Sequence, residues 1–527
     1  MESQQPDTQQ AAPSRSGVSR REVLRIGGVG SLAAVASTLI GGCGPCAAPP
    51  PPGAQTPGGP AFNRVAGKKP RNIIFMVSDG MSAGVPTIAE PFSQRLRKRG
   101  THWHRLMRDR GVVHGQLSTR SLDSLVTDSS AASSAWGSGS RVDNAALNVL
   151  PDGTKLTPIA TLLTNANRRV GLVTTDVMTG ATPAGFACVS PSRKLYDDLA
   201  LQYQDCVDVI LGGGRRYFDP LSRADHLDLI GLYQKGGYDF LADRAAVLSR
   251  PPSGRQRVLG LFDEMQMPYT IDHMQSDVLR AKAPTLAEMS RYALRVLSSS
   301  PDGFFIMIEG ARIDHAAHVN DAGAMMWDQL AFDDAIGEAL AFIEHRDDTL
   351  LVISSDHGNG NPGLVGMGKH YHDTDACFEV FTQAKASFAM LFHALASPAS
   401  MGDKAAVHGY IKENFAVDLT PEETAVITRA LATRRFEDDL WEEQRTWFGA
   451  LSQALANRTG LAFNAHSHTA DNVICTALGP GAEAFSGLTE HPEVFRIFAD
   501  YNGVSYVNPS AEKTAPAAEP AKAAAVG

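Results

Sequence analysis

The stretch NIIFMVSDG, residues 72–80, decides the fold. Its first six residues are almost all apolar, which is typical of a strand buried on both faces, and the last three read as a loop. Similar apolar runs recur at 171–175, 207–211, 304–308 and 349–353. Helical periodicity lies between them, most clearly at 284–298 and 322–344. This alternation predicts an α/β protein, a three-layer α/β/α sandwich with a large, mostly parallel central sheet.

Three of these predicted strands run into an acidic residue, namely Asp79, Glu309 or Asp356. In open α/β sheets the active crevice lies beyond the carboxyl ends of the strands. One such acid alone would be read most simply as a solvated loop side chain. Three acids at equivalent topological positions instead predict a metal site at that edge of the sheet.

The decapeptide EGARIDHAAH, residues 309–318, adds a further acid and an imidazole. If the chain turns helical after the strand, Asp314 and His318 lie one turn apart on the same face. A carboxylate and an imidazole so placed can hold one zinc ion and leave positions open for water or substrate.

The tripeptide Asp356-His357-Gly358 supplies a second carboxylate–imidazole pair. Adjacent side chains of a strand point in opposite directions, so both can reach one ion only where the backbone turns. Gly358 permits such a turn. Together with Asp79, the two pairs predict a binuclear metal site.

The segment VTDSSAASSAW, residues 126–136, places an acid and a serine before a run of small residues. Read as a helix, it puts Ser129 at the N-terminus, where free backbone N–H groups and the helix dipole favour an anionic phosphate. Small side chains would let this helix pack tightly under the site. By itself, the segment fits a Ser/Ala-rich helix without function equally well.

In their order and spacing, these residues resemble the motifs of alkaline phosphatases. The resemblance extends from about residue 71 to residue 480 and is carried by 72–81, 127–129, 181–183, 192–193, 309–318, 356–358 and 468–469. Weaker matches lie at 211–214 and 284–289. The resemblance implies the fold of that family and hydrolysis of phosphate monoesters through a phosphoserine on Ser129.

The resemblance also implies two zinc ions and one magnesium ion, with the following ligands. One zinc ion would be held by Asp314, His318 and His468. The other would be held by Asp79, Asp356 and His357, with Ser129 as the reacting ligand. The magnesium ion would be held by Asp79, Thr182 and Glu309, an all-oxygen set that suits a hard cation.

On the substrate side, the resemblance implies that Arg193 holds two phosphate oxygens in a bidentate fork, oriented by Asp128. His315 occupies a position where related enzymes carry Lys or His near the phosphate, and we expect it to tune the site. Gly180 stands where the family often has an Asp or His that contacts a magnesium-bound water. This departure leaves the metal of the third site open.

Several other residues compete for these roles. His466 lies two residues from His468, although the His-Thr pair favours His468 as the zinc ligand. Ser130 competes with Ser129, which alignment on Thr-Asp-Ser favours. We expect His370 and His372 to be structural or exposed.

Three other functions compete with phosphate monoester hydrolysis. A sulfatase would need Cys or Ser two residues before Pro and four before Arg, and the stretch CVSPSR, residues 188–193, is one residue too long. A phosphodiesterase of the same superfamily would use the same metals and nucleophile. A non-catalytic metal-binding surface lipoprotein would need neither Ser129 nor Arg193, and both are present.

The composition is that of an ordinary globular protein, and the N-terminal sequence predicts export. The formal net charge of −9 argues against a nucleic-acid partner. Residues 1–46 read as a twin-arginine export signal, with SRREVLR at 19–25 and a lipobox that ends at Cys43. We therefore expect the protein in the periplasm, or anchored outside the cytoplasm by a lipid on Cys43. Cleavage by a signal peptidase near this position would instead release a soluble product.

The remaining chain divides into a Pro/Gly/Ala-rich linker at 47–70, a catalytic domain at 71–508 and a low-complexity tail at 509–527. Two stretches, about 215–272 and 362–464, look like additions to the catalytic core. The second contains TPEE at 420–423, which predicts a capped helix start. The expected partners are small phosphate monoesters and a second copy of the chain. The spacing of Cys188, Cys206, Cys377 and Cys475 does not reveal a disulfide pairing.

Overall fold

The computed structural model describes residues 68–250, 256–395, 397–434 and 446–511. The predicted export signal, Cys43, the linker up to residue 67 and most of the predicted tail lie outside the described residues. Among the helices of the described part, none has both the length and the apolar character needed to cross a bilayer.

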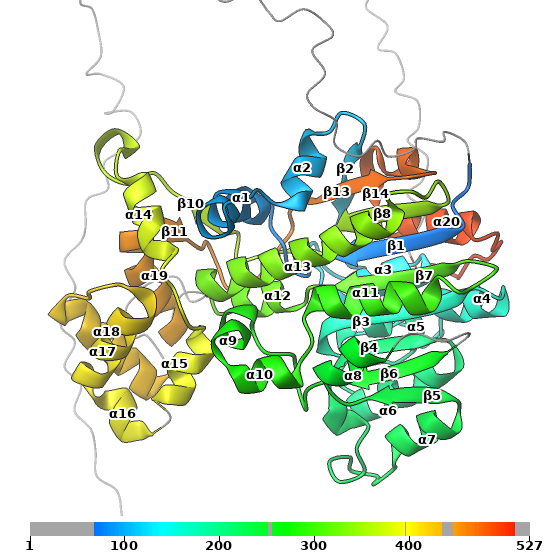
Figure 1. The fold of residues 1–527 in the computed structure, drawn as a ribbon, viewed down its shortest axis with the longest axis horizontal. Coiled ribbons are helices and arrows are strands. Elements are labelled where there is room, and N and C mark those ends of the chain that lie inside the picture. Colours follow the sequence, from blue (N-terminus) through cyan, green and yellow to red (C-terminus); the bar gives the residue numbers. More distant parts are fainter. Residues whose placement is uncertain (1–67, 251–255, 396, 435–445, 512–527) are drawn as a thin grey trace, which may run out of the picture. The chain divides into compact units, whose positions relative to one another are not determined.

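A ten-stranded sheet forms the centre of the fold (Figure 1). Its order is β14 (Gly487–Glu490), β2 (Val113–Ser118), β13 (Val473–Leu478), β8 (Thr349–Ser354), β1 (Asn72–Val77), β7 (Phe304–Glu309), β3 (Arg169–Val177), β4 (Val209–Gly213), β6 (Arg257–Leu261) and β5 (Tyr238–Leu241). Only β13 runs antiparallel to its neighbours in this sheet. The five apolar runs of the sequence form β1, β3, β4, β7 and β8, which lie in the middle of the sheet because both of their faces are buried.

Alternate residues of the central strands face two separate hydrophobic cores. Ile74 and Met76 of β1 belong to one core, while Ile73 and Phe75 belong to the other. The first core contains side chains of α1 (Gly84–Arg97), α2 (His102–Arg108), α8 (Arg244–Ser249), α9 (Thr270–Gln275), α11 (Leu286–Leu297), α12 (Arg312–Ala317) and α13 (Ala322–Ile343). The second contains side chains of α3 (Ser129–Ser138), α4 (Ile159–Asn165), α5 (Ala181–Ala187), α6 (Tyr196–Gln202), α7 (Leu229–Lys235) and α20 (His491–Tyr501).

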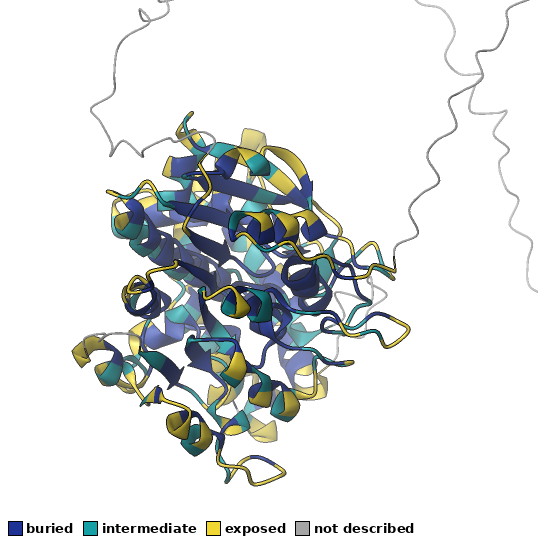
Figure 2. Cartoon of the chain, turned by 90° about the vertical axis from the view of Figure 1, so that its right-hand side faces the viewer, coloured by how far each residue is buried: buried dark blue, intermediate teal, exposed yellow. Residues whose placement is uncertain are grey.

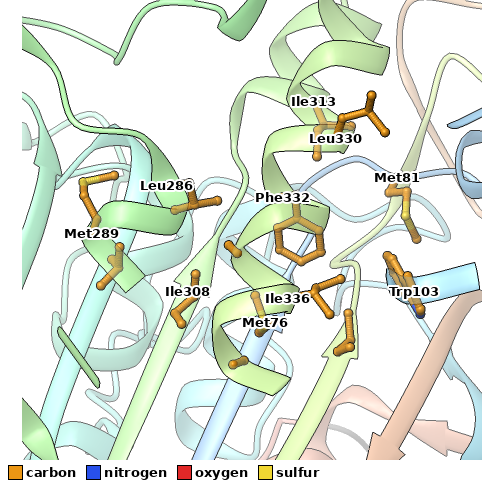
Figure 3. Close-up of a cluster of buried hydrophobic side chains, with 14 of the residues drawn as sticks. Met76, Met81, Trp103, Leu286, Met289, Ile308, Ile313, Leu330, Phe332 and Ile336 are labelled. Atoms are coloured by element: carbon orange, nitrogen blue, oxygen red, sulfur yellow. The ribbon is translucent and has the colours of Figure 1, made fainter. Parts of the chain in front are cut away.

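Helices therefore cover both faces of the sheet, which confirms the predicted three-layer sandwich. Figure 2 shows the strands of the sheet largely buried between their helical layers. Figure 3 shows part of the first core, where Met76 and Ile308 of neighbouring strands lie beneath Phe332 and Ile336 of α13. Burial of such side chains contributes roughly 1.5–3 kcal/mol each.

The predicted addition at 215–272 extends the sheet at one end. It contributes β6, which pairs with β4, and β5, which forms the edge. Helices α7, α8 and α9 connect these strands to the rest of the fold, and α10 (Asp277–Lys282) follows.

The predicted addition at 362–464 is mainly helical and has a hydrophobic core of its own. Its helices are α14 (Thr374–Phe381), α15 (Phe388–Ala394), α16 (Pro398–Gly402), α17 (Lys404–Phe415), α18 (Pro421–Thr433) and α19 (Trp447–Thr459), drawn in yellow and orange in Figure 1. Helix α18 begins as the sequence predicts, with Thr420 as the N-cap and Glu423 completing the capping box. Buried carboxylates tie this region to the sheet domain, since Asp272 accepts hydrogen bonds from the backbone and hydroxyl of Ser387.

Short pairings and turns complete the fold. β9 (Gly358–Asn359) pairs with β12 (His468–Thr469), and β10 (Gly363–Leu364) pairs with β11 (Leu461–Ala462). The short 3-10 turns are η1 (Tyr203–Asp205), η2 (Arg215–Tyr217), η3 (Lys369–Tyr371) and η5 (Ala482–Phe485). The four described cysteines are free thiols: Cys188, Cys206, Cys377 and Cys475.

Candidate active site

Four neighbouring strands, β8, β1, β7 and β3, end at the same edge of the sheet. The parallel register places Val77 of β1 beside Glu309 of β7 on one side and Ser354 of β8 on the other. Asp79 and Asp356 follow two residues after these paired positions. The three acids predicted to share one sheet edge are therefore together, as the topology requires.

One candidate metal group consists of Asp314, His318 and His468, whose ligand atoms all lie within 4.8 Å of one another. Asp314 and His318 project from the same face of α12 and its last turn, with Asp314 Oδ2 3.3 Å from His318 Nε2. His468 reaches the same point from β12, and its Nε2 lies 3.1 Å from His318 Nε2. One carboxylate and two imidazoles form a donor set that suits zinc.

Backbone carbonyls orient both imidazoles of this group. His318 Nδ1 lies 2.8 Å from the carbonyl oxygen of His466, and His468 Nδ1 lies 2.8 Å from that of Thr127. With the proton on Nδ1, each ring donates to its carbonyl and directs the Nε2 lone pair into the site, as in many protein metal centres. Burial, reinforced by the charge of His357, lowers the pKa of His468 to about 4. This imidazole is therefore neutral at physiological pH and able to bind a metal.

A second candidate group consists of Asp79, Asp314 and His357, whose ligand atoms also lie within 4.8 Å of one another. Asp356 joins it, since Asp356 Oδ2 lies 3.1 Å from His357 Nε2. The backbone N–H groups of Gly80 and His357 donate to Asp356 Oδ1 at 3.0 Å each, which fixes the carboxylate. Asp314 thus lies between the two groups, as expected where two metals are close.

Two glycines allow this crowding. Gly80 has a φ of +67°, and a Cβ there would lie 2.3 Å from Asp314 Oδ1. The sequence suggested that Gly358 permits a turn, but its φ is not positive, so backbone conformation does not require glycine at this position. A Cβ at Gly358 would instead lie 2.5 Å from Thr469 Oγ1, so the glycine is needed for the close approach of β9 and β12.

Ser129 is the first residue of α3, as the sequence predicts. Its side chain is buried, and its Oγ lies 3.1 Å from His357 Nε2. The rings of His357 and His468 are stacked with centroids 3.6 Å apart, so Ser129 is close to both candidate metal groups. Ser130 points away, because its hydroxyl donates to the carboxylate of Asp128.

Asp128 links the start of α3 to Arg193. It is the N-cap of α3, and its Oδ1 accepts a hydrogen bond from Ala131 N at 2.9 Å. Its Oδ2 accepts from Arg193 Nη1 and from Ala145 N, both at 3.0 Å. One carboxylate therefore fixes both the N-terminus of α3 and the guanidinium beside it.

Helix α5 lies directly against α3 and presents Thr182 in its first turn. Glycines permit the approach, since a Cβ at Gly137 would lie 2.0 Å from the carbonyl oxygen of Gly185. Ser133 Oγ also donates to the carbonyl of Ala181 at 3.0 Å. The run of small residues in α3 thus allows the tight packing that the sequence predicted.

The third predicted group contains only oxygen donors. Thr182 lies close enough to Glu309 to lower the pKa of that carboxyl, although its buried hydroxyl makes no hydrogen bond of normal geometry. Thr174 Oγ1 donates to Glu309 Oε2 at 2.5 Å. Burial, followed by the charge of Asp176, raises the pKa of Glu309 to about 8.

The electrostatics of this edge fit bound cations. Burial, reinforced by Asp356 and Asp314, raises the pKa of Asp79 well above its usual value. Asp79 Oδ1, Asp356 Oδ2 and Thr182 Oγ1 are buried and have no hydrogen-bond partner among the described residues. Unpartnered oxygens at this density are costly in an interior unless a cation binds them. The residues present therefore fit the implied metals.

The other histidines considered in the sequence analysis are not in the two metal groups. His315 lies on α12 with its Nδ1 2.8 Å from Arg312 Nη1, and burial lowers its pKa. His466 contributes its carbonyl to His318, while its ring contacts Phe448. His370 and His372 are exposed.

Two residues of the site did not emerge from the sequence. Asn359 Nδ2 donates to Asp314 Oδ1 at 2.7 Å and so orients the carboxylate shared by the two metal groups. Its place directly after the 356–358 tripeptide is a signal that could have identified it. Asp176 contributes a further carboxylate, through its effects on the pKa values of Glu309, Arg193 and His315.

Comparisons with known proteins agree with this geometry. The family model described as alkaline phosphatase matches residues 70–503. Alkaline phosphatase 3 of Bacillus subtilis (strain 168) is 28% identical over 433 residues, which cover 80% of this chain and 87% of the relative. The crystal structure of Thermus thermophilus alkaline phosphatase is 31% identical, covers 84% of this chain and 93% of that chain, and has a TM-score of 0.77. A cold-active alkaline phosphatase from a psychrophilic Shewanella sp. is 27% identical, covers 81% and 99%, and has a TM-score of 0.65.

Proposed function

The chain belongs to the alkaline phosphatase family and is a phosphatase, and from this we propose that it hydrolyses phosphate monoesters through a phosphoserine formed on Ser129. The observation that carries the proposal is the position of Ser129 Oγ. It lies at the N-terminus of α3, 3.1 Å from His357 Nε2, where both candidate metal groups meet.

The proposed cofactors are two zinc ions and one magnesium ion. Asp314, His318 and His468 would hold one zinc ion, and Asp79, Asp356 and His357 would hold the other. Asp79, Thr182 and Glu309 would hold magnesium. When bound, these cations supply Lewis acidity that favours the Ser129 alkoxide and neutralises charge on the reacting oxygens.

We propose that hydrolysis proceeds by two successive displacements at phosphorus. In the first, Ser129 Oγ bonds to phosphorus, the ester P–O bond breaks, and the alcohol leaves with a proton. In the second, a water oxygen bonds to phosphorus, the Ser129–phosphate bond breaks, and the serine hydroxyl is restored. Arg193, held by Asp128, grips two phosphate oxygens through both steps, and the N–H groups at the start of α3 face the same anion.

Arg193 and the third cation favour a dianionic monoester over a diester. A phosphodiesterase is the second candidate, because hydrolysis of a diester could use the same nucleophile and the same metals. A non-catalytic metal-binding surface lipoprotein is the third, and it is disfavoured by the placement of Ser129 within the metal groups. We propose that His315, beside Arg312 on α12, tunes the site rather than reacting.

We also propose export by the twin-arginine route, with the protein in the periplasm or held outside the cytoplasm by a lipid on Cys43. The support is the SRREVLR segment at 19–25 and the residues before Cys43. A homodimer is proposed as the assembly. Mass spectrometry of the mature N-terminus and light scattering of the purified protein test these two proposals.

Hydrolysis of chromogenic esters tests the reaction. The metal-loaded protein should prefer 4-nitrophenyl phosphate to bis(4-nitrophenyl) phosphate and to 4-nitrophenyl sulfate at alkaline pH. The Ser129→Ala variant should lose this activity. A preference for the diester or the sulfate would contradict the monoesterase proposal while leaving the fold and the metal groups intact.

A further inference from the structure

Asp176 is an acidic residue near the proposed magnesium group and has no role in the proposed reaction. It lies near the end of β3, the strand next to β7, which carries Glu309. Its carboxylate lies over Gly180, since a Cβ at Gly180 would come within 2.4 Å of Asp176 Oδ2. The backbone of Gly180 has a φ of −62°, which any residue can adopt, so space rather than conformation favours glycine there.

An irregularity in β3 brings Asp176 to this place. The register with β4 shifts between Val173 and Val177, as in a β-bulge. Such bulges redirect side chains and often lie next to active sites. Thr174 stabilises the arrangement, because its Oγ1 accepts from Asp176 N at 2.9 Å and donates to Glu309 Oε2 at 2.5 Å. One hydroxyl thus connects the Asp176 backbone to the Glu309 carboxylate.

The oxygens around this point lack partners. Asp176 Oδ1 is buried and forms no hydrogen bond with the described residues. The same holds for Thr182 Oγ1, on a residue that is only 1% exposed, and for Asp79 Oδ1, on a residue that is 5% exposed. Buried carboxylate and hydroxyl oxygens without donors are costly, and a cation bound nearby would offset that cost.

We propose that Asp176 supports the third cation site, by placing a carboxylate from the space above Gly180 beside the ion that Asp79, Thr182 and Glu309 would hold. The proposal rests on the third site of the proposed function. The ligand oxygens of Asp79, Thr182 and Glu309, together with the added negative charge of Asp176, favour magnesium over zinc.

Magnesium binding tests the proposal without relying on activity. Isothermal titration calorimetry of the zinc-loaded protein with MgCl2 would compare wild type with Asp176→Asn, which keeps the size of the side chain and removes its charge. Asp198→Asn, at an exposed position on α6, is the matched control. We expect Asp176→Asn to weaken magnesium binding about 10- to 100-fold, the effect typical of a lost carboxylate around a metal. Its zinc content by mass spectrometry and the binding of the control should equal those of wild type.

A relocated carboxylate makes the test specific. In Asp176→Ala/Gly180→Asp, the new side chain occupies the space that Asp176 leaves, although its Cβ also lies 2.9 Å from the carbonyl oxygen of Val177. In protein whose circular dichroism spectrum and zinc content equal those of wild type, magnesium affinity should return towards wild type. Asp176→Ala alone should remain weak. The proposal is overturned if Asp176→Asn binds magnesium within about twofold of wild type, if the zinc-loaded wild type binds none, or if the relocated carboxylate restores nothing. Failure of ester hydrolysis with these binding differences intact would instead refute only the proposed function.

Discussion

Asp128 offers a prediction that separates phosphate binding from helix stability, because its two oxygens accept from different N–H donors, while the Ser130 hydroxyl contacts both. Oδ1 accepts from Ala131 N and so caps α3, while Oδ2 accepts from Arg193 Nη1 and Ala145 N. In Asp128→Asn, the amide oxygen can serve only one of these sides. If the amide oxygen still accepts from Ala131 N, the NH2 group faces the N–H donors of Arg193 and Ala145. Arg193 then loses its hydrogen-bond acceptor.

The magnitude follows from the strength of the lost contact. A hydrogen bond to a charged group contributes about 1.5–3 kcal/mol. The side chains of Arg193 and Asp128 are 30% and 20% exposed, so solvent screening places the value near the lower end. A loss of about 1.5 kcal/mol corresponds to about a tenfold fall in kcat/KM. Since Asn is also a good N-cap, the free energy of unfolding should fall by less than about 1 kcal/mol.

The assay is the kcat/KM for 4-nitrophenyl phosphate, measured with the inhibition constant for inorganic phosphate and the apparent Tm. We expect the inhibition constant to rise together with the fall in kcat/KM, because Arg193 binds the phosphate group itself. Asp243→Asn is the matched control, since Asp243 caps α8 through Ala246 N at 2.8 Å in the same way. The reasoning is refuted if Asp128→Asn keeps kcat/KM within about twofold of wild type, or if the control loses activity equally.

Three further predictions concern packing, pH and metal removal. Gly185→Ala should lower the apparent Tm, because its Cβ would lie 2.1 Å from Ser133 Oγ and overpacking costs about 1–3 kcal/mol. The control Gly409→Ala, where the Cβ enters open space on α17, should not lower the Tm. Equal Tm values for the two variants would argue against tight packing of α3 against α5. Burial raises the pKa of Asp328 to about 7, so its contribution to stability is full below about pH 4 and is lost as the pH rises through 7. Asp328→Asn, which can still pair with Thr270, should therefore have a higher Tm than wild type at pH 8.5 and no such gain at pH 4, and a gain at both would contradict burial as the cause. Removal of bound metal with EDTA should lower the Tm, since a ligand at a thousandfold excess over its Kd stabilises by about 4 kcal/mol; an unchanged Tm after verified metal loss would count against cations offsetting the buried carboxylates.

Local pattern and topology account for the part of the fold that could be predicted. The apolar runs before Asp79, Glu309 and Asp356 mark buried strands, and parallel strands bring their carboxyl ends to one edge. The spacing of Asp314 and His318 depends only on helical periodicity. Each of these features is contained in a short segment, so it can be predicted from the sequence alone.

Contacts between distant segments account for what could not be predicted. The β3 bulge that brings Asp176 beside Glu309 depends on how β3 pairs with β4. The orientation of His318 by the carbonyl of His466 likewise depends on segments 148 residues apart. The placement of β13 as an antiparallel strand between β2 and β8 is a further example. None of these has a local sequence signature.

The most direct test of the account is the site of phosphorylation during turnover. Metal-loaded protein would be mixed with 4-nitrophenyl phosphate, quenched in acid and digested, and the peptide that contains 126–136 analysed by tandem mass spectrometry. We predict phosphate on Ser129 in wild type, and neither phosphate nor turnover in Ser129→Ala. Phosphate on another residue, or full turnover by Ser129→Ala, would contradict the proposed reaction.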